Sequence, residues 1–402
     1  FNSEDSKKIY IDQLNESHNG FSNEIYNIDL AKPGIIIVGP WRGKKESLKA
    51  FKETLKNIQL ICGWPIFADP LSGIDSKQPG LIYNWELLID SGFLIPEIGL
   101  EVLRLGTLPS SRLLIDWLKN LGKNQLLISE CDYRYLDPLL IANQWNYGLE
   151  SWWVNFSGKF IDGKKVLINN FSNIFLNQLL EKDYLIDSWL EEKIKLIGMV
   201  NEPSLARWIP RLLPAGFNLM LSSSSPVRDW ITYGGKASFS GRCFAFRGAS
   251  GIDGTLSLAM GLSMVIGRMV LITGDLALLH DSNGWLFANS YKPPLIVLLI
   301  DNQGGGIFSQ LGIEEINEGN LKKLFKMPQS VDPLALASAY GVPYRQISCL
   351  EDLESAFDWG FSNKGPVLLR VCTCSESDNN LRNEIRNELK NYFQNLIKNK
   401  AI

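Results

Sequence analysis

The sequence predicts an α/β protein with two doubly wound, mainly parallel-sheet domains, and three observations lead to this fold class. Short aliphatic runs alternate along the chain with longer stretches that repeat apolar residues at helical spacing. The run 295–300 is aliphatic at every position, as expected for a parallel strand that is covered on both faces. The length of 402 residues exceeds what one hydrophobic core usually serves.

The elements follow in order along the chain. In the first half we expect strands at 35–38, 65–67, 101–105 and 125–129, and helices at 44–58 and 112–121. In the second half we expect strands at 217–221, 244–246, 270–273, 295–300 and 367–371. Its helices are expected at 203–213, 254–266, 278–291, 332–340, 351–361 and 381–397.

A charged helical stretch at 169–197 divides the two halves. We therefore expect an N-terminal linker at 1–30, a first, Rossmann-like domain at 31–165, a helical linker at 166–200 and a second domain at 201–402.

Composition excludes several classes of protein. The formal net charge of -3 gives no bulk attraction for nucleic acid, and no apolar run approaches a membrane span. The polar opening stretch lacks the apolar core of a secretory signal. Six scattered cysteines favour reduced thiols in a cytoplasmic protein, and two histidines make a Cys/His zinc site improbable.

The glycine turn Gly39–Gly43 is the first candidate for chemistry. A phosphate loop needs four residues between its glycines and then Lys and Ser or Thr, whereas three intervene here and Lys45 follows Lys44. A plain strand-to-helix turn is the better interpretation.

The second candidate is a pair of polar strand ends. Asp275 and Asn302 each follow a predicted strand and lie 27 positions apart, so both can face one crevice at the carboxyl edge of a sheet. A carboxylate, an amide oxygen and glycine carbonyls suit magnesium. The helix expected from Leu278 would direct its N-terminus toward the same crevice. On spacing alone, two unrelated strand ends explain the pattern equally well.

Two further segments could bind anions. Arg247 leaves a strand end before a glycine-rich turn that does not fit G-x-G-x-x-G, and its planar guanidinium suits a carboxylate. The serine run 222–225 precedes Arg228 and forms a helix N-cap or an anion pocket. A surface arginine and an ordinary cap remain equally good interpretations.

Several motifs together carry a resemblance to a known family. The segments RGASGIDG at 247–254, GDL at 274–276 with His280-Asp281, and DNQGGGIF at 301–308 resemble thiamine-diphosphate-dependent 2-succinyl-5-enolpyruvyl-6-hydroxy-3-cyclohexene-1-carboxylate synthases (MenD). By this resemblance, 30–165 is similar to the family's middle domain and 200–400 to its thiamine-diphosphate-binding domain. The family's N-terminal pyrimidine-binding domain has no counterpart in these 402 residues, which begin with Phe1, so we expect the chain alone to be inactive.

The resemblance implies roles for individual residues. Asp275, Asn302 and the Gly304 carbonyl would hold magnesium, or manganese, on the diphosphate, with Leu276 also at the cofactor. Ile252 would bend the thiamine, and Ile307, Phe308 and Leu311 would form an apolar wall beside it. The residues implied for binding substrate carboxylates are Ser224, Arg228, Arg247 and Arg112. Two departures from the family are Asp301, where Asn is commoner, and Ala277, where Ser is common.

The activity implied is that of a transferase in menaquinone or phylloquinone biosynthesis. It decarboxylates 2-oxoglutarate and adds the product carbanion to isochorismate, and the complete protein would form a homo-oligomer, a dimer or a tetramer. Another thiamine-diphosphate carboligase is one alternative, although the several arginines argue against small neutral substrates. A non-catalytic diphosphate-binding or assembly module is the alternative from a different class.

Overall fold

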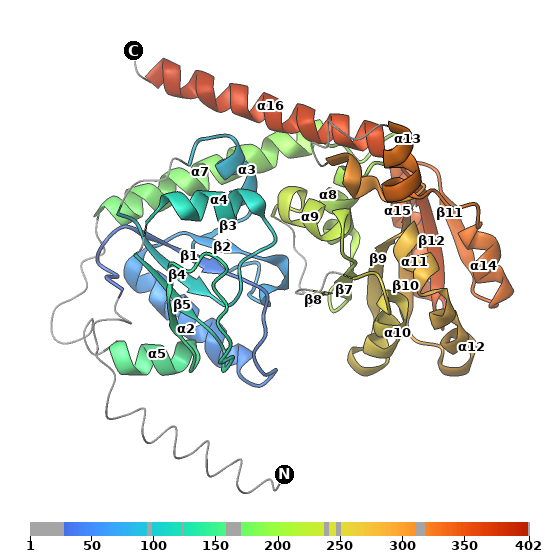
Figure 1. The fold of residues 1–402 in the computed structure, drawn as a ribbon, viewed down its shortest axis with the longest axis horizontal. Coiled ribbons are helices and arrows are strands. Elements are labelled where there is room, and N and C mark those ends of the chain that lie inside the picture. Colours follow the sequence, from blue (N-terminus) through green and yellow to red (C-terminus); the bar gives the residue numbers. More distant parts are fainter. Residues whose placement is uncertain are drawn as a thin grey trace, which may run out of the picture.

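A computed structural model describes residues 28–94, 99–122, 124–157, 170–236, 241–246, 251–310 and 318–400. The described chain forms two six-stranded sheets that lie side by side, the first built from its N-terminal half and the second from its C-terminal half (Figure 1). Every strand pairing within the two sheets is parallel. The predicted class of two parallel α/β sheets is confirmed.

The first sheet has the strand order β3-β2-β1-β4-β5-β6, which is the order of a Rossmann sheet. Its strands are β1 (Gly34–Val38), β2 (Ile66–Ala68), β3 (Leu81–Ile82), β4 (Glu101–Leu105), β5 (Gln125–Ile128) and β6 (Asn143–Trp145). Its helices are α2 (Leu48–Cys62), α3 (Trp85–Asp90), α4 (Arg112–Asn120) and α5 (Leu149–Phe156).

The second sheet has the order β11-β12-β10-β9-β7-β8. Its strands are β7 (Asn218–Leu221), β8 (Cys243–Ala245), β9 (Met269–Gly274), β10 (Leu295–Asp301), β11 (Tyr344–Ile347) and β12 (Val367–Cys372). Its helices are α8 (Glu202–Leu212), α9 (Ser225–Tyr233), α10 (Thr255–Ile266), α11 (Asp275–His280), α12 (Phe287–Tyr291), α13 (Glu318–Leu321), α14 (Pro333–Ala339) and α15 (Leu353–Ser362).

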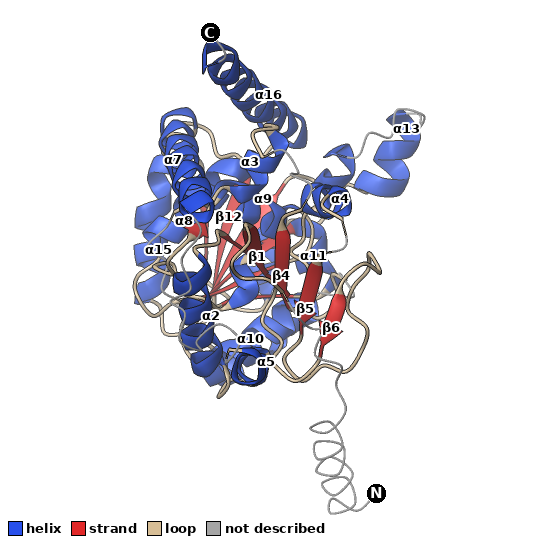
Figure 2. Cartoon of the chain, turned by 90° about the vertical axis from the view of Figure 1, so that its left-hand side faces the viewer, coloured by secondary structure: helices blue, strands red, loops and turns tan. Residues whose placement is uncertain are grey.

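The central strands of both sheets are buried, with helices on either side of each sheet, which explains why these strands read as aliphatic runs (Figure 2). Side chains alternate along β10, so that Ile296 and Leu298 pack under α8, α9 and α15, while Val297 and Leu299 pack under α10, α11 and α14. No helix in the described part of the chain is both long enough and apolar enough to cross a membrane.

Two long helices, α7 (Asn170–Lys193) and α16 (Ser375–Lys400), connect the two sheets along one side of the molecule (Figure 1). Helix α16 starts after β12 of the second sheet, but its Ile385, Leu389 and Phe393 are buried in the core of the first. Lys193 of α7 reaches Glu384 and Glu388 of α16 at 2.5 and 2.9 Å. The C-terminal helix therefore belongs to the packing of both sheets.

The prediction of one continuous helix at 278–291 is wrong. The chain forms α11, a 3-10 turn at Ser282–Leu286 and α12 instead. The physical reason lies in Asp281, whose carboxylate accepts hydrogen bonds from the Ser257 amide and hydroxyl at 2.7 and 2.9 Å. A side chain engaged outside the helix, followed by Ser-Asn-Gly, breaks the helical run.

The helix expected at 44–58 begins later than predicted, at Leu48, and runs on to Cys62. It stops at Gly63, which takes the left-handed conformation (φ 67°) that glycine adopts at helix ends.

Candidate functional site

The two polar strand ends lie side by side. Strands β9 and β10 are parallel neighbours, with Gly274 opposite Ile300, so that Asp275 and Asp301 stand at the same edge of the sheet. Helix α11 begins directly at Asp275. The sequence prediction that these segments face one another is confirmed, although the helix starts three residues earlier than we expected.

Asp275 is a buried carboxylate held by backbone groups. Its Oδ1 accepts from the Leu276 N–H and its Oδ2 from the Gly304 N–H, both at 2.7 Å. Burial raises the pKa of Asp275 from its usual 3.8 to about 6, and the negative charge of the neighbouring Asp301 adds to the rise. Because the folded chain disfavours this charge, a cation bound here would relieve the cost.

The triple glycine brings its loop close to another backbone segment. A Cβ on Gly304 would lie 1.9 Å from the Lys326 carbonyl oxygen, and one on Gly305 would lie 2.5 Å from that of Phe325. The Gly305 N–H donates to Lys326 O at 2.6 Å. Gly304 also has a φ of 124°, which strains any other residue. The glycines therefore allow the loop to reach Asp275.

Asn302 presents an amide oxygen that is buried and has no hydrogen-bond partner among the described residues. Its Nδ2 donates to Glu202 Oε1 at 2.7 Å, so the oxygen is the free end of the amide. A buried oxygen without a hydrogen-bond partner lowers the stability of the fold. A bound cation that accepts its lone pair would remove this cost.

This donor set fits a divalent cation bound with a diphosphate. Within the described ranges, no three His, Cys, Asp or Glu side chains gather closely enough to hold a metal ion. Asp275, the Asn302 oxygen and a Gly304 carbonyl offer three hard oxygens. Magnesium typically takes few protein ligands and completes its octahedron with water and phosphate oxygens.

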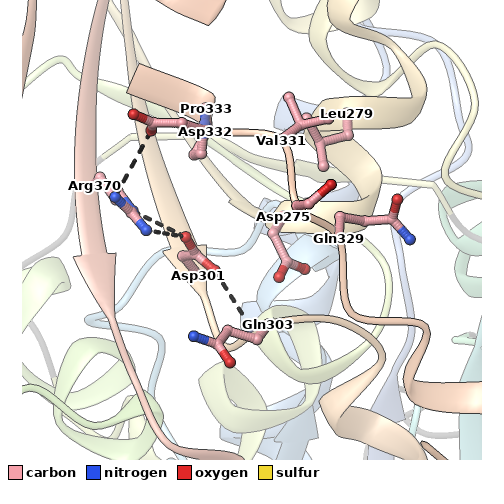
Figure 3. A pocket seen from close by; sticks show the side chains of 10 residues that line it. Asp275, Leu279, Asp301, Gln303, Gln329, Val331, Asp332, Pro333 and Arg370 are labelled. Atoms are coloured by element: carbon pink, nitrogen blue, oxygen red, sulfur yellow. Dashed lines mark hydrogen bonds and ion pairs between the residues drawn. The ribbon is translucent and has the colours of Figure 1, made fainter. Parts of the chain in front are cut away.

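A cavity of about 220 Å³ lies against this edge of the sheet (Figure 3). Asp275 lines it together with Asp301, Gln303 and Arg370. Arg370 of β12 forms an ion pair with Asp301, with Nε and Nη2 at 2.9 and 2.7 Å from its Oδ2 (Figure 3). Asp301 Oδ1 accepts from the Gln303 N–H at 3.2 Å, which holds the start of the glycine loop. The negative charge that Asp301 brings to a position where Asn is commoner is therefore balanced by Arg370.

The serine run ends in a strained residue at the start of α9. Ser224 has φ 84° and ψ -141°, a region that essentially only glycine adopts, and its side chain makes no capping bond. The Arg228 Nη1 donates to the Ser224 carbonyl at 2.7 Å, while the rest of its side chain is exposed. The two predicted substrate residues are thus brought together.

The predicted apolar residues are half-buried. Ile252 precedes α10, and Ile307 and Phe308 lie on the 3-10 turn Gly306–Gln310, where Phe308 packs against Phe325 at a ring-centroid distance of 5.4 Å. Leu276 is half-buried beside Asp275. Arg247 and Leu311 lie outside the described residues.

Arg112 lies on the first sheet's side of the molecule, as the first residue of α4. It is 94% exposed, and its Nε lies 3.6 Å from Asp116 of the same helix. Ser111 caps this helix by accepting from the Leu114 N–H at 3.2 Å, and its hydroxyl donates to Glu86 at 2.7 Å. The substrate role of Arg112 stays a prediction.

Sequence reasoning missed a buried ionic cluster behind Asn302. Arg382 of α16 donates to both carboxylate oxygens of Asp229, at 2.9 and 2.5 Å, and to Glu202 at 2.5 Å. The partners lie up to 180 positions apart, so no local pattern connects them. The only signal in the sequence was an acidic residue, Glu202, at the start of an otherwise apolar helix face.

Comparisons with known proteins agree with this geometry. Residues 231–371 match the family "Thiamine pyrophosphate enzyme, C-terminal TPP binding domain". The chain is 49% identical, over 379 residues and 94% of its length, to a 2-succinyl-5-enolpyruvyl-6-hydroxy-3-cyclohexene-1-carboxylate synthase of Prochlorococcus marinus (strain MIT 9313). Synthases of the same name from P. marinus (strain NATL2A) and Synechococcus sp. (strain CC9902) are 50% and 47% identical over 90% of the chain.

The chain spans 65%, 60% and 62% of the lengths of these three relatives. The family implies thiamine diphosphate as the cofactor, bound together with a divalent metal. The matched range contains both strand ends and the glycine loop described above. Residues 231–371 therefore match the C-terminal, TPP-binding domain of thiamine pyrophosphate enzymes, and the chain as a whole is similar to 2-succinyl-5-enolpyruvyl-6-hydroxy-3-cyclohexene-1-carboxylate synthases.

Proposed function

We propose that this chain is part of a thiamine-diphosphate-dependent carboligase that decarboxylates 2-oxoglutarate and adds the resulting carbanion equivalent to isochorismate. The observation that carries the proposal is the buried oxygen of Asn302, which has no partner among the described residues and stands on the loop that contacts Asp275. The names of the relatives support the choice of substrates.

In this proposal, Asp275, Asn302 and the Gly304 carbonyl hold magnesium or manganese. When bound, thiamine diphosphate supplies a nucleophilic carbon and accepts the charge that decarboxylation leaves. The chain's own residues would then contribute by holding the reactants in place and by excluding water. Phe308 and Ile307 exclude water from that side of the site, which strengthens each electrostatic contact there.

Both proposed substrates are anionic, so cationic groups should bind them. The guanidinium of Arg228 is exposed at the start of α9 and hydrogen-bonded only through Nη1 in the contacts described above, which leaves donors for a carboxylate. Arg247, Ser224 and Arg112 are proposed for the same task. Their several charges favour dicarboxylate substrates over the small neutral ones of other carboligases.

We also propose that the complete protein is a homo-oligomer. Helix α10 is apolar around most of its circumference, yet Leu258, Met264 and Val265 are exposed at 45%, 50% and 84%. On α12, Phe287 and Tyr291 are exposed as well. Exposed apolar helix faces of this kind indicate a contact with another subunit.

Two further expectations remain proposals. Six unpaired cysteines, three of them exposed, support a reducing, cytoplasmic setting. We also propose domains at 31–165 and 201–402, joined by a linker at 166–200, with α16 of the second domain packed on both sheets.

The test is calorimetric titration of the chain with thiamine diphosphate, with and without Mg²⁺. Wild type should bind only when the metal is present, and Asp275→Ala should lose this binding. Asp253→Asn, which changes an 80% exposed carboxylate that contacts His280, should bind normally and serves as the control. Metal-independent heat, or unchanged binding by Asp275→Ala, would support a non-catalytic module instead.

Turnover is tested separately. The chain is assayed with 2-oxoglutarate and isochorismate, alone and with the N-terminal third of a relative supplied as a second protein. Carbon dioxide release that depends on both substrates supports the proposed reaction. Release with 2-oxoglutarate and a simple aldehyde, but not with isochorismate, would favour a different carboligase.

A further inference from the structure

The side chain of Asn302 is held from behind by a residue of another helix. Its Nδ2 donates to Oε1 of Glu202, the first residue of α8, at 2.7 Å. Glu202 is 4% exposed and lies 100 positions away in the sequence. A long-range hydrogen bond between two such residues constrains how the amide can turn.

The partner of Glu202 fixes which end of the amide faces it. Oε2 of Glu202 accepts from Arg382 Nη2 at 2.5 Å, with side-chain exposures of 3% and 9%. A carboxylate paired with a guanidinium is ionised, and an ionised carboxylate only accepts hydrogen bonds. Asn302 must therefore present its NH₂ to Glu202 and its oxygen to the opposite side.

We propose that Glu202 is a positioning residue that orients the Asn302 amide so that its oxygen, and not its nitrogen, faces the metal. The inference rests on the proposed function, since it concerns a metal site at Asp275 and Asn302. Arg382 assists by holding Glu202 from the other side, and through it α16 is connected to the site. Outer partners of metal ligands typically contribute 10- to 100-fold to metal affinity.

A purely structural role for Glu202 makes a different prediction. The Glu202 N–H also donates a hydrogen bond to Asp378 Oδ1 of α16 at 3.3 Å. If Glu202 only joined α8 to α16, its replacement would lower stability and leave the metal affinity unchanged. Stability without metal and affinity for metal must therefore be measured separately.

The experiment exchanges donor and acceptor across the hydrogen bond. In Glu202→Gln, Arg382 takes the one remaining oxygen, and the new NH₂ faces the NH₂ of Asn302, which favours turning the Asn302 oxygen away from the metal. Asn302→Asp alone places a second carboxylate against Glu202. The double variant Glu202→Gln/Asn302→Asp pairs the new NH₂ with the new carboxylate and returns an oxygen to the metal.

Asp229→Asn is the matched control, because Asp229 binds the same arginine without contacting Asn302 in any hydrogen bond described above. Each variant of the 402-residue chain is titrated with Mg²⁺ by calorimetry at saturating thiamine diphosphate. The melting temperature is measured without metal.

We expect Glu202→Gln and Asn302→Asp each to weaken Mg²⁺ binding by about 10- to 100-fold, and the double variant to recover at least tenfold over either. Asp229→Asn, which alters another partner of Arg382, should keep the wild-type affinity. Wild-type affinity in Glu202→Gln, an equal loss in Asp229→Asn, or no recovery in the double variant overturns the inference. Absence of Mg²⁺-dependent binding in wild type is a separate result, which overturns the proposed function itself.

Discussion

Removal of Arg382 should destabilise the protein strongly. Its guanidinium lies at 2.5 Å from both Glu202 and Asp229, and the three side chains are 9%, 3% and 7% exposed. Arg382→Met keeps much of the volume but leaves two carboxylates buried without their cation. Breaking a buried pair in this way costs about 3–5 kcal/mol, a large share of a typical unfolding free energy.

The loss should depend on pH in a defined direction. Burial already raises the pKa of Asp229 from 3.8 to about 6 in the presence of Arg382, and loss of the cation raises the pKa further. A carboxyl whose folded pKa is raised stabilises the fold at low pH, and this contribution is lost as the pH rises through the folded pKa. The difference in unfolding free energy between wild type and Arg382→Met should therefore be largest at pH 8 and become smaller toward pH 5.

The assay is urea unfolding followed by tryptophan fluorescence at pH 5, 6.5 and 8. Lys193→Met is the matched control, because it also removes a cation that contacts α16. Its partners Glu384 and Glu388 are 52% and 44% exposed, so its cost should stay within about 1 kcal/mol at every pH. A cost below about 1 kcal/mol for Arg382→Met at pH 8, or a gap independent of pH, would refute the reasoning.

Three further outcomes are expected. Gly306→Ala places a Cβ 2.6 Å from Asn302 Nδ2 and should weaken Mg²⁺-dependent cofactor binding about tenfold by calorimetry, whereas unchanged affinity would contradict the site. Asp183→Asn should stabilise the chain by about 3 kcal/mol at pH 8 and hardly at pH 4, because burial raises the pKa of Asp183 from 3.8 to about 6; identical pH profiles in thermal unfolding would contradict this. Val265→Asp should shift the complete protein toward monomer in analytical ultracentrifugation, and unaltered sedimentation would count against the proposed interface.

The strands were predictable from the sequence where burial leaves a local signature. The predicted strand 101–105 coincides with β4, and β10 differs from its prediction by the single residue Asp301. In a parallel sheet covered on both faces, each strand is apolar along its length, so the pattern is visible without knowledge of its neighbours. The same reasoning placed Asp275 and Asn302 at adjacent strand ends.

Short or edge elements were missed for the opposite reason. Strand β3 has two residues, β6 has three of which only Trp145 is buried, and β11 is exposed at three of its four positions. Such strands carry no continuous apolar run, and only pairing with a neighbour defines them. Helix α3 has six residues, too few to show a helical period.

The buried cluster could not be predicted because its members come from three helices. Glu202 is the first residue of α8, whereas Asp229 and Arg382 lie inside α9 and α16. In the sequence, each is an ordinary charged residue of a helical stretch. Their pairing depends on α16 returning across both sheets, which the sequence gives no means of anticipating. The cluster proposed to orient Asn302 therefore could not be predicted from the sequence. Asp275 and Asn302, which would contact the metal, could be.

The charge balance of the strand ends follows from this arrangement. Asp301 would add a second free carboxylate beside Asp275, and two of them would repel a diphosphate. Arg370 neutralises Asp301 at 2.7 Å, just as Arg382 neutralises Glu202 behind Asn302. Asp275 is then the one carboxylate of these three without a cationic partner among the described residues. One negative charge with two neutral oxygens attracts a divalent cation and leaves that cation with positive charge for the phosphates.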